Sequence, residues 1–217
     1  MGDLQRAPES VGAWLWFVVP DGAPDTAAVL APLAEAAAVL REHGLLHLES
    51  VDAVWEHPRG GRIDDLRTVP VPGGAITESL VRDIEETRPS ESSEARLKLV
   101  RTHGSGTWVD GSGTARTEDD LVVLESMPVL DEISLEAAVH HDVWARYAFS
   151  GIPHPQVYDA NAPRLAAALQ GIEAAVGTKT EPGDSTGFGR VQGYGIQDPE
   201  PDDIEDGRAP DLTYLLS

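Results

Sequence analysis

The order of hydrophobic and polar positions near the start of the chain predicts a strand, a helix and a second strand. Residues 11–19 (VGAWLWFVV) alternate between two sets that are both apolar, which is typical of a strand buried on both faces. Apolar residues at helical spacing predict a helix over residues 26–43, and Asp25 or Thr26 is placed to cap it. Residues 45–55 indicate a second strand.

The middle of the chain is rich in predicted strands. Residues 96–102 alternate between apolar and polar side chains, and residues 121–125 form a short apolar run. Residues 133–144 alternate over a longer stretch, which favours an antiparallel strand with one buried face and one exposed face. The glycines and prolines within residues 57–74 predict a loop.

A second long amphipathic helix is predicted over residues 162–176. Asp159 or Asn161 is placed to cap this helix, and Pro163 suits its first turn because proline has no backbone N–H to donate. A shorter helix with a more polar surface is predicted over residues 75–87.

These elements predict a single α+β domain over residues 1–196. We expect a mostly antiparallel sheet of about five to seven strands, with the two main helices, 26–43 and 162–176, packed on one face. Residues 197–217 carry seven acidic residues and one arginine. We expect them to form an acidic, largely flexible C-terminal tail.

The apolar stripes of these elements define a predicted core. In the first strand we assign Leu15, Phe17 and Val19 to it, and in the two main helices we assign residues such as Leu33 and Leu165.

The charge of the chain narrows the classes of partner. The sequence holds 37 acidic and 16 basic residues, for a net charge of −21. Nucleic acids and anionic membrane surfaces both require a cationic protein face, so we expect neither as a partner. The same charge is compatible with a cationic protein partner, or with high solubility alone.

The absence of cysteine excludes disulfides, thiolate catalysis and cysteine-ligated zinc. No apolar run has the length of a membrane span, and the first ten residues do not have the pattern of a signal peptide. We therefore expect a cytoplasmic protein. The abundance of Ala, Gly, Pro, Asp and Arg is typical of a GC-rich bacterial genome.

Histidines in the second half of the chain are candidate metal ligands. His140 and His141 stand next to Asp142, and His154 follows nearby in the sequence. Imidazole and carboxylate groups together suit zinc or iron. Neighbouring residues of a strand point to opposite faces, so only one of the adjacent pair can join a site. His141 and His154 are the candidates, and the alternative is a pair of ordinary histidines on a sheet. We expect no cofactor.

The connection over residues 142–159 is the candidate partner-binding surface. It is unusually rich in aromatic residues, and loops of that composition are more often recognition surfaces than plain linkers. Aromatic side chains supply binding energy, and carboxylates beside them attract a cationic partner. The residues assigned to this surface are Trp144, Tyr147, Phe149, Tyr158, Asp142 and Asp159.

The function predicted from these observations is that of a non-catalytic binding protein. Its acidic, aromatic-containing surface would hold a cationic protein, and one concrete form is an immunity or antitoxin-type inhibitor of a basic toxin domain. The alternative is a small-ligand-binding protein or a metal-dependent enzyme, with a His/Asp pocket around residues 141–164. A third hypothesis is an accessory subunit that docks through the apolar end of its tail, residues 212–216.

Overall fold

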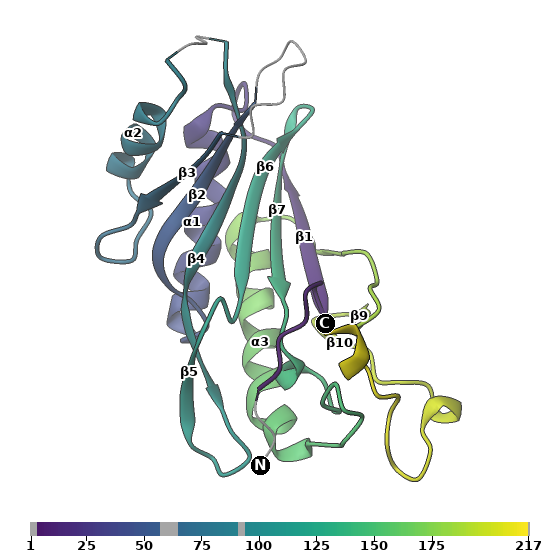
Figure 1. Ribbon diagram of the computed structural model, residues 1–217. Helices are drawn as coiled ribbons and strands as arrows, with labels where there is room; N and C mark the ends of the chain where they lie inside the picture. The colour runs from purple at the N-terminus through teal and green to yellow at the C-terminus, as the bar shows by residue number, and fades with distance from the viewer. Residues whose placement is uncertain (1–3, 57–64, 91–93, 217) are drawn as a thin grey trace.

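A large antiparallel sheet organises the molecule. The computed structural model describes residues 4–56, 65–90 and 94–216. Within them, an eight-stranded sheet runs in the order β3-β2-β4-β6-β7-β1-β8, and β5 pairs with β4 outside that path (Figure 1). Its strands are β1 (Gly12–Val18), β2 (His47–Glu56), β3 (Asp65–Pro70), β4 (Arg96–Val109), β5 (Ala115–Asp119), β6 (Val123–Val129), β7 (Glu132–Val139) and β8 (Glu181–Pro182).

Two long helices cover one face of this sheet, and no α-helix of the described residues covers the other. α1 (Thr26–Glu42) and α3 (Pro155–Val176) pack against each other behind the strands (Figure 1). The shorter α2 (Glu78–Glu86) lies at the β3 side. This arrangement confirms the predicted α+β domain with two main helices on one face. In the described part of the chain, no helix combines the length and the apolar character needed to cross a membrane.

The first helix forms where the sequence predicts it. The Asp25 carboxylate accepts a hydrogen bond from the Ala28 N–H at 2.8 Å, which satisfies one of the free donors of the first turn. Gly44, just past the helix, has a φ of +66°, a conformation that a residue with a side chain rarely adopts. α1 therefore has the predicted start and end, and Pro32 lies inside it.

The second long helix begins earlier than its apolar stripe indicates. α3 starts at Pro155, so Asn161 and Pro163 lie inside it and neither Asp159 nor Asn161 caps it. The Asn161 side-chain amide instead exchanges two hydrogen bonds with the backbone of Val109, each 2.8 Å long. In the sequence this asparagine resembles a helix cap. Its hydrogen bonds to a strand that is distant in sequence leave no local pattern that would indicate otherwise.

In β1 the residues that face the helices are the opposite set from the predicted one. Trp14 and Trp16 are fully buried against the helices, whereas Leu15 and Phe17 lie on the other face and are half-buried. Val19 lies beyond the strand and is 72% exposed. Both sets are apolar, so alternation alone does not select between them. The two indole rings bury more apolar surface than the side chains of Leu15 and Phe17, and they lie on the face that the helices cover.

Two strands lie in regions where the sequence predicts none. β3 falls within the predicted loop of residues 57–74, of which residues 57–64 lie outside the described part. β5 is polar along its whole length and pairs with the far end of β4. β4 itself continues through Gly104, where a Cβ atom would come within 2.1 Å of the His47 carbonyl oxygen. Glycine permits this close approach of two strands, so β4 continues beyond residue 102, where the predicted strand ends.

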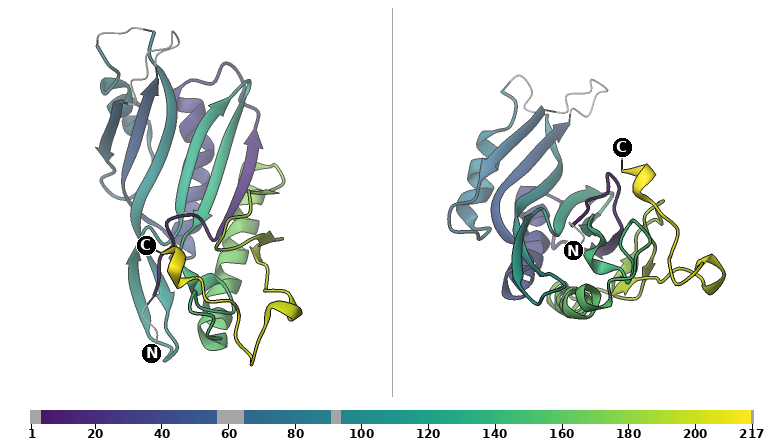
Figure 2. Two further views of the ribbon diagram at one scale, coloured as in Figure 1. Left: turned by 45° about the vertical axis from the view of Figure 1, so that its right-hand side comes forward. Right: turned by 60° about the horizontal axis from the view of Figure 1, so that its bottom comes forward.

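The chain ends lie against the domain. Residues before β1 cross the lower end of β7, where the Ala7 N–H donates to the His140 carbonyl at 2.8 Å. Within residues 197–216, the Leu212 N–H donates to the Phe149 carbonyl at 2.6 Å, and Asp198 pairs with Arg146 at 2.9 Å (Figure 2, yellow segment). The predicted flexibility of this tail stays a prediction. A two-stranded sheet, β9 (Val191–Gln192) with β10 (Gly195–Ile196), precedes it.

Candidate binding surface on the open sheet face

A row of carboxylates crosses the sheet face that carries no helix. Residues paired directly across neighbouring strands point to the same face. Because Trp14 and Trp16 point to the helices, Leu15 and every residue in register with it point to the open face. One such row reads Thr68, Asp52, Arg101, Glu125, Glu136, Leu15 and Glu181 from β3 to β8. We call its four acidic members, Asp52, Glu125, Glu136 and Glu181, the acidic row.

The charges within the acidic row are only partly balanced. The Arg101 guanidinium lies 3.2 Å from a Glu125 carboxylate oxygen, and both side chains are partly exposed. Burial raises the pKa of Glu136, and the negative charge of Glu125 raises it further. The positive charge of Arg101 acts in the opposite direction and does not overcome these two effects. The centre of the face therefore holds negative charge that a positive group from outside would stabilise.

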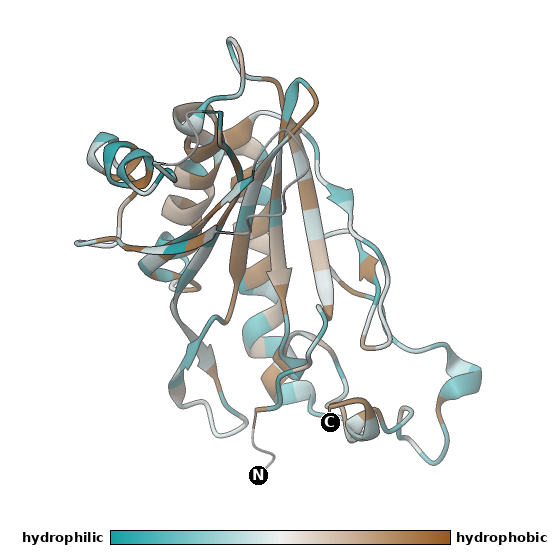
Figure 3. Ribbon diagram, turned by 45° about the horizontal axis from the view of Figure 1, so that its top comes forward, coloured by the Kyte–Doolittle hydropathy of each residue, from teal (hydrophilic) through white to brown (hydrophobic). Residues whose placement is uncertain are grey.

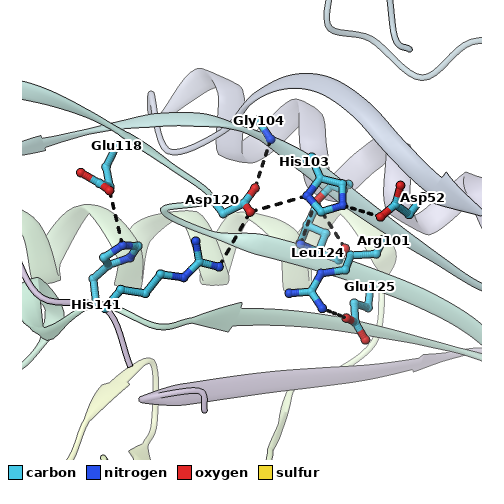
Figure 4. Close-up of polar contacts among 11 residues, drawn as sticks. Asp52, Arg101, His103, Gly104, Glu118, Asp120, Leu124, Glu125 and His141 are labelled. Carbon is cyan, nitrogen blue, oxygen red and sulfur yellow. Dashed lines mark hydrogen bonds and ion pairs between the residues drawn. The ribbon is translucent and has the colours of Figure 1, made fainter. Parts of the chain in front are cut away.

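A histidine held between two aspartates borders the row (Figure 4). His103 Nε2 lies 2.8 Å from Asp52 Oδ2, and His103 Nδ1 lies 3.5 Å from Asp120 Oδ2. Arg6 reaches the same Asp120 oxygen at 3.8 Å. These contacts join three strands and the N-terminal segment into one polar network.

The network also favours the charged form of Asp52. Burial opposes ionisation of Asp52, but hydrogen bonds from Thr68 and His103, with their neighbouring positive charges, outweigh it and lower its pKa. Asp120 adopts a φ of +49° and accepts a hydrogen bond from the Gly104 N–H at 3.3 Å. A residue with a side chain adopts that φ only when its surroundings impose it, so Asp120 is held in place from both sides.

Apolar side chains lie beside the acidic row on the same face. Leu66, Val54 and Leu99 are cross-strand partners on β3, β2 and β4, and Leu66 is 54% exposed. Phe17 on β1 occupies the corresponding side of the row at the other end of the sheet. The alternation of hydrophilic and hydrophobic residues along the strands is visible in Figure 3. The open face therefore has carboxylates next to apolar side chains, as protein–protein interfaces do.

The predicted partner-binding residues do not form one exposed surface. Trp144, Phe149 and Asp142 are buried, with 1%, 3% and 4% of their surface exposed. Tyr147 and Tyr158 are half-buried, and the Arg146 guanidinium stacks 4.5 Å from the Tyr158 ring centre. Asp159 is exposed on α3. The aromatic-rich connection fills the space between the end of β7 and α3, so much of its apolar surface is part of the core.

The two candidate metal ligands have separate surroundings. His141 is 1% exposed, and burial, together with the charge of Arg6, lowers its pKa to about 4. Its Nε2 atom lies 3.9 Å from Glu118. His154 precedes α3, and its Nε2 is hydrogen-bonded to the Ala145 carbonyl at 2.8 Å. Within the described ranges, no group of three or more His, Asp or Glu residues is placed to hold a metal ion.

The buried Asp142 carboxylate is held by backbone hydrogen bonds. Its carboxylate accepts hydrogen bonds from the backbone N–H groups of Gln5 and Phe149, both at 3.4 Å. Burial raises its pKa despite these bonds and the nearby charge of His154. The side chain thereby ties the N-terminal segment to the connection between β7 and α3.

The acidic row was only half visible in the sequence. The alternation of 133–144 places Glu136 on the polar side of its strand, whereas the alternation of 96–102 places Arg101 on the same side as Leu97 and Leu99. Strand order and register, which bring them into one row, leave no mark in a single sequence.

Searches of protein-family models, of curated proteins and of solved structures found no match to this chain.

Proposed function

We propose that this protein is a non-catalytic binding protein that holds a cationic protein on its open sheet face. The observation that carries the proposal is the acidic row, which extends across the sheet on the face without a helix. This moves the proposed interface away from the 142–159 connection, whose main aromatic residues are buried.

The electrostatics of the face support a positively charged partner. The pKa of Glu136 is raised first by burial and then by the negative charge of Glu125, and the positive charge of Arg101 does not offset these effects. A lysine or arginine from a partner would supply further positive charge and would bring hydrogen-bond donors as well. The net charge of −21 would also speed the encounter with a basic protein at low salt.

The apolar side chains beside the row favour a folded protein over a free metal ion or a polyamine. Leu66 and Phe17 would be buried only by a partner that has an apolar surface of its own next to its basic residues. A basic toxin domain, such as a nuclease, has this chemistry. In this form the protein is an immunity or antitoxin-type inhibitor that acts in the cytoplasm.

The proposal is tested with two double variants that change the net charge equally. Glu125→Gln with Glu136→Gln removes two charges from the acidic row. Glu35→Gln with Asp159→Asn removes two from the exposed helix surfaces, and Asp159 is also a residue of the first predicted site. The wild-type protein is first used to retain a basic protein from a lysate at about 50 mM salt and to release it at about 500 mM. The released protein is identified by mass spectrometry, purified and titrated against each variant.

We expect the row variant to bind this partner about tenfold more weakly and with a smaller salt dependence, and the helix variant to bind like the wild type. Equal affinities for the two variants would reject the open face as the interface. A stronger loss from the helix variant would return the interface to the α3 side. Retention of no basic protein at low salt would reject the cationic partner itself.

A further inference from the structure

A cavity of about 380 Å³ is lined by none of the residues of the His103 network. Three segments that are distant in sequence enclose it: residues 145–149, residues 185–190 and parts of the C-terminal segment 196–212. Cavities of this size are within the usual range for small-molecule sites. None of His141, Asp142, His154 or Arg164, the residues of the predicted His/Asp pocket, lines it.

Aromatic side chains form the apolar part of the cavity. Phe149 and Phe188 line it and contact each other edge to face, with ring centres 5.3 Å apart. Ile196 and Leu212 add aliphatic surface from the C-terminal segment. Only 3% of Phe149 and 8% of Phe188 is exposed, so a third ring would contact the parts of the two rings that form the cavity wall.

The charged residues that line the cavity are Arg146, Arg190, Asp198 and Glu200, and the surroundings of the two arginines differ. Arg146 is already engaged, because Asp198 pairs with it at 2.9 Å and the Tyr158 ring stacks beneath it. Arg190 is exposed, and among the described residues it has no ion-pair partner. In a chain with 37 acidic and 16 basic residues, an arginine without such a partner at the edge of an apolar cavity is a specific feature.

The cavity walls are held by close backbone contacts. A Cβ atom on Gly189 would lie 2.3 Å from the Val11 carbonyl oxygen, and one on Gly151 would lie 2.1 Å from the Ala209 carbonyl oxygen. The Thr186 hydroxyl donates to the Ser10 carbonyl at 2.6 Å. Walls fixed in this way do not have to be ordered when a ligand enters, which lowers the free-energy cost of binding.

We propose that this cavity binds a small aromatic carboxylate, with the ring against Phe149 and Phe188 and the carboxylate paired with Arg190. The inference does not depend on the proposed protein partner, because the cavity shares no residue with the acidic row. It gives the C-terminal segment a role as one wall of the site.

The test uses three probes that share a phenyl ring: 3-phenylpropanoate, the neutral 3-phenylpropanamide and the cationic 3-phenylpropylamine. Each is titrated into the full chain while backbone amide signals are followed by NMR. We expect shifts at residues 145–149 and 185–190, with the carboxylate binding about threefold to tenfold more tightly than the amide and the amine weakest. Arg190→Gln should remove the preference for the carboxylate over the amide.

Arg208→Gln is the matched control, because it removes the same charge from an exposed residue of the C-terminal segment that does not line the cavity. This variant should keep the preference for the carboxylate. Absence of binding by all three probes at about 10 mM would overturn the proposal. So would shifts located elsewhere, an amide that binds as tightly as the carboxylate, or an Arg190→Gln protein with unchanged affinity.

Discussion

The two faces of the sheet are built from the same strands but have opposite chemistry. Toward the helices, Trp14 and Trp16 on β1 and Leu135 on β7 are completely buried, and the polar Ser126 donates its hydroxyl to the Val29 carbonyl at 2.7 Å. The residues that alternate with the buried ones along β6 and β7 point to the open face, and they include Glu125 and Glu136. One face is apolar, and its buried polar atoms include the Trp16 indole N–H, which has no hydrogen-bond partner among the described residues. The other face retains unbalanced charge.

This difference separates stability from recognition. Burial of apolar surface is the main favourable contribution to folding, and here it is concentrated on the helix-covered face. A row of like charges contributes little to stability, and its repulsion is relieved only by a positive group. Substitutions on the covered face should therefore change the free energy of unfolding, whereas those on the open face should chiefly change binding.

Neighbouring residues of β1 give the largest expected contrast. Trp16→Ala should lower the free energy of unfolding by about 3–5 kcal/mol, because it leaves a large cavity against the helices. Phe17→Ala, on the half-buried open side, should cost less than half as much. Urea denaturation measures both. Similar losses from the two variants would mean that the open face contributes as much to the core as the covered one.

Acid should act on the covered face through His141. Its pKa in the folded protein is about 4, below the ordinary value of 6.5, so the unfolded chain binds more protons between these two values. Stability contributed by the neutral histidine is therefore complete above about pH 6.5 and decreases as the pH falls toward 4. The full loss amounts to about 3 kcal/mol at 1.36 kcal/mol per pKa unit.

The His141→Leu variant isolates this effect from other acid-sensitive groups. The lowered pKa values of Asp52 and Asp110 also reduce stability in acid, but they do so in the wild type and in the variant alike. We expect the difference in unfolding free energy between the two proteins to shift in favour of the variant from pH 7 to pH 4.5. A difference that is constant with pH would show that the pKa of His141 is the same in the folded and the unfolded protein.

The sequence predicted the elements that have a strong local pattern. The helix over residues 26–43 has both an apolar stripe and a capping aspartate, and the covered stripe of β7 alternates without interruption into the buried His141. In β1, where both sets of residues are apolar, the pattern did not select the buried side. β5 has no apolar alternation because its side chains are mostly exposed.

The candidate site was less predictable than the fold. The aromatic residues over 142–159 suggested an exposed surface, but aromatic composition does not distinguish an interface from a core. The acidic row depends on the register of seven strands, which is decided by tertiary packing. The cavity beside Arg190 depends on where the C-terminal segment lies, and neither its acidic residues nor its apolar end, residues 212–216, indicates that position in the sequence.

The smallest expected effect on stability is that of Glu136→Gln on the open face. Its raised folded pKa means that the folded protein binds more protons than the unfolded chain between the ordinary value of 4.5 and that raised value. The stability of the wild type therefore decreases as the pH rises through this window, and the penalty is complete above it. The neutral variant avoids the penalty, so its unfolding free energy at pH 7 should be higher, by no more than about 1 kcal/mol.

The gain should disappear below pH 4.5, where the wild-type carboxyl group is protonated in both states. Glu35→Gln on the exposed surface of α1 is the control and should change stability little at either pH. A Glu136→Gln protein that is less stable at pH 7 would mean that Arg101 already compensates the carboxylate. A variant that is more stable and also binds the cationic partner more weakly would show that Glu136 destabilises the free protein and stabilises the complex.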